Sequence, residues 1–112
     1  MKLPGADRAV VDANKLRDYC LNPMHPRGRH KARVFASALR IPQAEAELLR
    51  VRLLDAVLQC DATAREADEY GSRYILDFEC VNGDRRATIR SGWIVRRGES
   101  FPMLATCYVV SE

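Results

Sequence analysis

The chain has 112 residues, of which 47% are hydrophobic and 29% are charged, and its formal net charge is +3. These values are typical of one ordinary globular domain, residues 1–112, and the chain is too short for two domains. Its apolar runs are too short to span a bilayer, and its first residues lack the apolar segment of a signal peptide. We therefore expect no membrane association and a cytoplasmic location, unless the chain is the tip of a larger exported protein.

The charges are unevenly distributed along the chain. Cations crowd residues 27–33 and 85–97, whereas acids gather between residues 45 and 79. A focused basic patch attracts a polyanion even when the net charge is small.

The four cysteines are far apart, and no two of them form a Cys-x-x-Cys pair. Zinc ribbons and thioredoxin-like sites need close pairs, so we expect neither. Each cysteine stands among apolar residues, which favours buried free thiols. The sequence predicts no metal site and no cofactor.

The first half of the chain has the pattern of three helices. Asp12 is a suitable N-cap for a helix at residues 13–21, which Asn22 and Pro23 end. A second helix is expected from Arg29 to about residue 40. Pro42 suits the first turn of a third helix at residues 43–59, which carries a wide stripe of leucine and valine.

The second half alternates like strands. Residues 61–66 fit an edge strand or an irregular segment, and strands are predicted at residues 71–81, 85–97 and 103–110. Asn82-Gly83 is a strong hairpin signal. The sequence therefore predicts an α+β fold, with three N-terminal helices packed on one face of a three- to four-stranded antiparallel sheet.

A two-residue turn at Asn82-Gly83 also predicts a register. Leu76 then faces Ile89 across the hairpin, and both are buried beneath the third helix. Arg90 lies on the opposite face, which we call the open face.

The last strand has two possible registers. In the preferred one Thr106 and Tyr108 share the open face with Arg90, and the inward residues are Met103, Ala105, Cys107 and Val109. The reverse register buries Thr106 and Tyr108 among apolar neighbours.

Residues 25–33 hold both histidines and four cations where a loop leads into the second helix. The free N–H groups and the positive dipole end of a helix start favour an anion there. A phosphate site is one interpretation, and a solvated basic helix start is the other. His25 could also simply cap the turn or the helix.

These residues fit RNA cleavage without a metal. Histidine can act as base or acid near neutral pH, and lysine and arginine can stabilise the charge of the transition state. The hypothetical catalytic residues are His25, Lys31, Arg90 and Thr106, and the substrate-binding residues are Arg27, Arg29, His30 and Tyr108. Each also has a purely structural explanation: Arg90, for example, could only offset Asp77 and Glu79. Tyr70, Tyr74 and Trp93 are interpreted as core or rim residues.

Four motifs resemble those of a small bacterial domain of unassigned function. They are Leu21-Asn22-Pro23-x-His25-Pro26-x-Gly28-x-x-Lys31-Ala32-x-x-Phe35, Tyr70-Gly71-x-x-Tyr74, Ile89-Arg90-Ser91-Gly92-Trp93-Ile94 and Pro102-x-Leu104-x-Thr106-x-Tyr108. That domain occurs alone and at the C-terminal ends of polymorphic toxins and phage head-associated proteins. Its layout is similar to that of the barnase–EndoU–colicin–RelE nucleases.

The resemblance implies a nuclease-like fold, with His25, Lys31, Arg90 and Thr106 at the matching motif positions. Ser91 stands where threonine is more usual. We therefore expect a metal-independent endoribonuclease toxin that binds RNA and is restrained by an antitoxin or immunity protein. The alternative is a non-catalytic binding module, antitoxin-like or an adaptor, that uses the same basic face for protein or nucleic acid.

Overall fold

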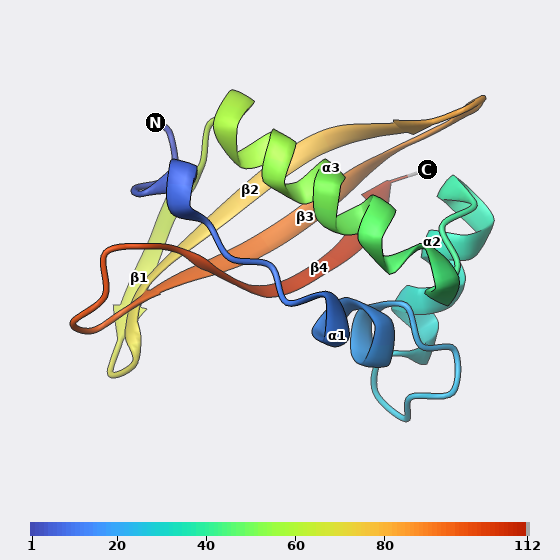
Figure 1. Ribbon diagram of the computed structural model, residues 1–112, viewed down its shortest axis with the longest axis horizontal. Helices are drawn as coiled ribbons and strands as arrows, with labels where there is room; N and C mark the ends of the chain where they lie inside the picture. Colours follow the sequence, from blue (N-terminus) through green and yellow to red (C-terminus); the bar gives the residue numbers. More distant parts are fainter. Residues whose placement is uncertain (112) are drawn as a thin grey trace.

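The computed structural model describes residues 1–111, and it confirms the α+β fold. Four antiparallel strands form one sheet in the order β1-β2-β3-β4. Figure 1 shows α3 crossing one face of this sheet, with α1 and α2 gathered near one end. The elements are η1 (Ala6–Arg8), α1 (Ala13–Lys15), η2 (Leu16–Cys20), α2 (Arg29–Leu39), η3 (Gln43–Glu45), α3 (Ala46–Gln59), β1 (Thr63–Asp68), β2 (Gly71–Asn82), β3 (Arg85–Arg96) and β4 (Met103–Ser111).

The first helix begins as predicted. The Asp12 carboxylate accepts a 2.8 Å hydrogen bond from the backbone N–H of Asn14, which satisfies a donor at the start of α1. α1 runs directly into η2, a π-helical turn, and Leu16 and Cys20 are buried there. The sequence did not indicate the π-helical turn.

The apolar stripe on α3 is narrower than predicted. Leu49, Leu53 and Val57 are buried at a spacing of four residues, which places them on one side of the helix. Val51 and Leu58 are 42% and 55% exposed, because they lie on the side that faces solvent. Within residues 1–111, no helix is long and apolar enough to cross a membrane.

The predicted hairpin register was wrong by two residues. Asn82 pairs with Arg85, so the turn is Gly83-Asp84, and Gly83 adopts the left-handed φ of 61°. A glycine at the first central position suits the twist of a two-residue hairpin. Leu76 therefore pairs with Ser91, not with Ile89.

A two-residue slip leaves every side chain on its predicted face, since successive side chains alternate. Leu76 and Ile89 are buried as expected. Ser91, the partner of Leu76 on β3, donates its hydroxyl to the Leu76 carbonyl at 2.7 Å and accepts from the Trp93 indole at 2.9 Å. Ser91 and Trp93 are thus parts of the core.

Strand β4 contains a bulge that the prediction did not include. Gly92 pairs with Thr106 but Trp93 pairs with Leu104, so Ala105 is an extra residue. Beyond the bulge the preferred register is correct, with Cys107 buried and Tyr108 opposite Arg90. Before the bulge it is wrong, because Leu104 is buried where Met103 and Ala105 were expected to point inward.

The sequence left residues 61–66 as either an edge strand or an irregular segment, and the structure has strand β1 there, from Thr63 to Asp68. All six of its residues are exposed, and it forms one edge of the sheet. Its pairing with β2 places Arg65 opposite Arg73 and Thr63 opposite Ile75. β1 therefore extends the open face past the part of the sheet that the helices cover.

Candidate functional site: the open face of the sheet

The face of the sheet turned away from α3 carries most of the residues predicted to have chemical roles. Alternation along the strands brings residues from all four of them to this open face. They are Thr63 and Arg65 of β1, Arg73, Ile75 and Asp77 of β2, Arg90, Gly92 and Ile94 of β3, and Thr106 and Tyr108 of β4.

Arg90 is held by two neighbours on this face. It lies directly opposite Asp77, and its Nε and Nη2 donate to the two carboxylate oxygens at 2.9 and 3.0 Å. Tyr108 lies opposite it on the other side. The Asp77 carboxylate first, and then the Tyr108 hydroxyl, raise the pKa of Arg90 above its ordinary value. The guanidinium is thus fixed in place and permanently charged.

Lys31 reaches the same place from α2. Its ammonium lies 4.8 Å from the centroid of the Tyr108 ring, the geometry of a cation–π interaction. Because β4 is an edge strand, a side chain from α2 can meet the open face there. Lys31, Tyr108 and Arg90 therefore form one cluster, built from α2, β4 and β3.

A shallow depression of about 320 Å³ lies beside this cluster, and Arg90, Tyr108 and Arg65 are among its lining residues. Thr106 is two residues before Tyr108 on the same face of β4, opposite Gly92. Cations and hydroxyl groups around one hollow are suited to holding a phosphate group. Asp77 also lines the depression and offsets part of the positive charge.

His25 has a structural role in the loop before α2. Its Nδ1 accepts hydrogen bonds from the backbone N–H groups of Arg27 and Gly28, at 3.0 and 3.1 Å. Its ring packs edge-on against Tyr19, with 4.6 Å between the centroids. The capping interpretation is confirmed, and in the neutral ring the proton is then on Nε2.

This cap affects the loop just before α2. The N–H groups of Arg27 and Gly28 donate to His25 and are therefore not free to bind an anion. The side chains of Arg27, Arg29 and His30 are exposed to solvent. The structure thus groups Lys31, Arg90, Thr106 and Tyr108, and it holds His25 against Tyr19.

The cysteines are mostly buried free thiols, as predicted: Cys20, Cys80 and Cys107 are buried and Cys60 is half-buried. The hydrogen bond that the Cys107 thiol donates to Cys20, and then burial, raise the pKa of Cys107. Within the described part of the chain, no three or more His, Cys, Asp or Glu side chains group in a way that could hold a metal ion.

Sequence reasoning missed Arg65 of the open face, which fell in the stretch without a firm assignment. The expectation that Arg90 offsets the charge of Asp77 is confirmed by their ion pair. Tyr70, which was interpreted as a core or rim residue, is 64% exposed and so belongs to the rim. The signal for Arg65 was present, since Thr63 and Arg65 alternate with Ala62 and Ala64.

Residues 2–111 match the family described as Domain of unknown function (DUF6883). The chain belongs to this family of domains, so the expected membership of a family without an assigned function is confirmed. The comparisons found no similar curated protein and no similar solved structure. Nuclease activity stays a prediction.

Proposed function

We propose that this protein is a metal-independent endoribonuclease whose active site is the Lys31–Tyr108–Arg90 cluster on the open face. One observation supports the proposal above all: two cations from different elements, Lys31 of α2 and Arg90 of β3, both lie beside Tyr108. A lysine and an arginine beside a hollow supply the charge stabilisation that phosphoryl transfer needs. In this proposal the protein acts in the cytoplasm as the toxin of a toxin–antitoxin or polymorphic toxin system.

The reaction is a transesterification within RNA. A base removes the 2′-hydroxyl proton, the 2′-oxygen attacks the phosphorus, and the 5′-oxygen leaves with a proton from an acid. The products are a 2′,3′-cyclic phosphate and a 5′-hydroxyl. Lys31 and Arg90 stabilise the charge on the phosphate oxygens, and the hydroxyls of Thr106 and Tyr108 donate hydrogen bonds to them.

Because Nδ1 of His25 accepts from the backbone, Nε2 carries the one proton of that ring; this N–H can donate a hydrogen bond to the leaving 5′-oxygen but is too weakly acidic to be the general acid. His30 is exposed on the first turn of α2, beside Lys31, and we assign it the base. We assign the acid to the ammonium of Lys31, which can give a proton to the 5′-oxygen. Arg27 and Arg29 contribute phosphate contacts from the same segment.

The test is cleavage of RNA by purified protein in the presence of EDTA, with analysis of the product ends. Arg90→Ala should lower the rate by about 100-fold or more, the scale of a lost charge stabiliser. Arg86→Ala is the matched control, because Arg86 is also an exposed β3 arginine facing a carboxylate, Glu79 at 3.6 Å. Intact RNA with wild-type protein, together with harmless overexpression in cells, would refute the nuclease.

The second candidate is a non-catalytic binding module that uses the same face for protein or nucleic acid. Two observations favour it. Nε and Nη2 of Arg90 already donate to Asp77, and Nδ1 of His25 is engaged as a cap, so these nitrogens are not free for catalysis. In that case RNA or a partner binds without being cut. Asp77→Asn should then tighten RNA binding, because it frees Arg90 from its competitor, while no cleavage product forms.

An antitoxin or immunity protein is the partner expected for a toxin. It would cover the cationic open face with acidic groups and exclude RNA. Co-expression of an acidic neighbouring gene product should relieve toxicity, and Arg90→Ala protein should no longer need it.

A further inference from the structure

Three depressions adjoin one another, two on the open face and a third that extends from it around β4 to Asp12 and Lys15. The first, beside Arg90 and Tyr108, shares Arg65 and Ile75 with a second depression of about 250 Å³. The second shares Arg73 and Ala105 with a third of about 610 Å³. Since neighbouring depressions are bounded by the same side chains, together they form one trough.

The trough follows the direction of the strands. Along β3 its lining residues advance two at a time from Arg90 through Gly92 and Ile94 to Arg96. Six residues of extended strand cover about 20 Å, at roughly 3.3 Å per residue. The trough is therefore long enough for several units of an extended chain molecule, and not only for a single phosphate group.

Gly92 keeps the middle of the trough open. A Cβ at this position would lie 3.2 Å from Cγ2 of Thr106 and 3.8 Å from Cδ1 of Ile75. Any larger side chain would project above these two residues and close the passage between the first and third depressions.

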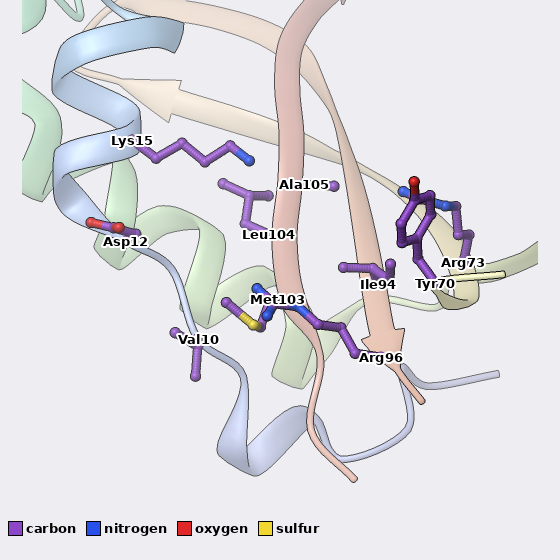
Figure 2. Close-up of a pocket in the computed structure, with 10 residues that line it drawn as sticks. All are labelled: Val10, Asp12, Lys15, Tyr70, Arg73, Ile94, Arg96, Met103, Leu104 and Ala105. Carbon is purple, nitrogen blue, oxygen red and sulfur yellow. The ribbon is translucent and has the colours of Figure 1, made fainter. Parts of the chain in front are cut away.

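The third depression, at the end far from Tyr108, combines an aromatic ring, apolar floor and cations. Figure 2 shows Tyr70 and Arg73 on one side of it, Lys15 on the other, and Met103 and Arg96 between them. The turn that carries Tyr70 is fixed: its N–H donates to Asp68 at 2.9 Å, and its carbonyl accepts from Arg97 at 3.1 Å. An exposed aromatic on a fixed turn is a suitable platform for a flat apolar group.

The charge of the lining favours an anionic occupant. Five cations line the three depressions, namely Lys15, Arg65, Arg73, Arg90 and Arg96, against the two carboxylates of Asp12 and Asp77. The carboxylate of Asp12 accepts a hydrogen bond from the start of α1. Arg73, Arg90 and Arg96 form ion pairs with Asp68, Asp77 and Glu99, so the positive charge offered to an occupant comes chiefly from Lys15 and Arg65. A flat group at one end and anionic groups along the length describe a single-stranded polynucleotide, whose unstacked bases are free to stack on aromatic side chains.

We infer that the trough is a binding track for single-stranded RNA, with the phosphate at Arg90 and Tyr108 and a downstream or upstream base stacked on Tyr70. This rests on the proposed function and specifies its substrate: an extended strand several nucleotides long. Duplex RNA does not fit, because its bases are stacked and paired within the helix.

The test measures binding apart from cleavage, with fluorescent 2′-O-methyl oligonucleotides that cannot form the cyclic phosphate. Tyr70→Ala should lower the affinity for an octamer by about tenfold, the order of one lost stacking contact, and leave the affinity for a dinucleotide unchanged. Tyr70→Phe should keep octamer affinity, because stacking needs the ring and not the hydroxyl. Leu58→Ala, which trims an exposed side chain on α3 away from the open face, is the control.

Gly92→Leu provides a second variant that removes no charge and no aromatic ring. It should reduce octamer binding and spare the dinucleotide, provided that circular dichroism shows a native fold. Octamer affinity that is unchanged by Tyr70→Ala, or equal affinity for duplex and single strand, would overturn the track. If the octamer binds in a Tyr70-dependent way but natural RNA stays intact, the track stands and the nuclease proposal fails. If RNA is cleaved but Tyr70→Ala leaves octamer binding unchanged, the nuclease proposal stands and the track fails.

Discussion

The ammonium of Lys31 lies 4.8 Å from the centroid of the Tyr108 ring, and Tyr108 stands opposite Arg90 in the sheet. One aromatic side chain therefore joins helix α2 to the open face. Lys31 and Tyr108 are 77 positions apart in the chain, so their contact depends on the docking of α2 against the edge of the sheet.

This contact should be measurable in the free energy of unfolding. In a double-mutant cycle with Lys31→Met and Tyr108→Leu, we expect a coupling of about 0.5–1 kcal/mol, the size of an exposed or half-buried cation–π interaction. Lys31→Met with Tyr70→Leu is the control cycle, because Tyr70 lies at the other end of the open face. In this control cycle the changes in unfolding free energy caused by the two single substitutions should add within about 0.5 kcal/mol. Zero coupling in the first cycle would contradict the contact.

Substitution of His25 separates its structural role from a chemical one. His25→Ala should lower the free energy of unfolding by about 1 kcal/mol, because it removes the acceptor of the Arg27 and Gly28 N–H groups. His25→Asn should restore most of this stability, since the amide oxygen can accept from the same turn. If the Nε2–H of His25 also donates a hydrogen bond to the leaving oxygen in the transition state, both variants should lose cleavage by about 100-fold. An active His25→Asn protein would leave His25 with the cap alone.

The exposed arginines before α2 predict the salt dependence of RNA binding. Replacing both Arg27 and Arg29 by alanine should make the slope of log K against log salt shallower by about 1.4, from about 0.7 per single-strand phosphate contact. A control that changes Arg17 and Arg86 should leave the slope in place, because these arginines face Asp18 and Glu79. An unchanged slope in the first variant would show that residues 27–29 do not contact phosphate.

The turn between β1 and β2 should weaken in acid. The Arg73 guanidinium, 2.6 Å from Asp68, lowers the pKa of that carboxyl, and the N–H of Tyr70 lowers it further. A carboxyl with a depressed folded pKa contributes stability above its unfolded pKa of about 3.9 and loses it as the pH falls through the folded value. Asp68→Asn should therefore show a smaller drop in melting temperature from pH 5 to pH 2.5 than wild type. Asp55→Asn, on α3, is the control, and equal drops in both variants would contradict the pair.

The sequence predicted the elements and faces well, because both follow from local periodicity. The slip of the hairpin did not affect burial, since Leu76 and Ile89 keep their face after a shift of two. It did misplace partners: Leu76 was expected opposite Ile89 and lies opposite Ser91 instead. The choice between Asn82-Gly83 and Gly83-Asp84 as the turn depends on contacts outside the hairpin, which a local signal does not contain.

The candidate site was predictable in part for the same reason. Arg90, Thr106 and Tyr108 share a face because strands alternate, whereas the bulge at Ala105 interrupts that alternation and so could not be predicted from it. Sequence also indicated that Lys31 stands near a helix start, but not that α2 docks beside Tyr108. The sequence left two interpretations of His25, a catalytic residue or a cap, and its hydrogen bonds with the following loop residues confirm the cap.

The side-chain amide of Asn82 donates a 2.8 Å hydrogen bond to the carbonyl of Leu39, the last residue of α2. Asn82, predicted from the sequence to lie in the hairpin turn, thus satisfies one of the backbone carbonyls left unpaired at the C-terminus of α2. The tip of the hairpin and the end of α2 should therefore open together, and amide hydrogen exchange in both segments should speed up by a similar factor in an Asn82→Gly protein. A substitution that improves the hairpin turn in isolation would, in this protein, loosen the helix that carries Lys31.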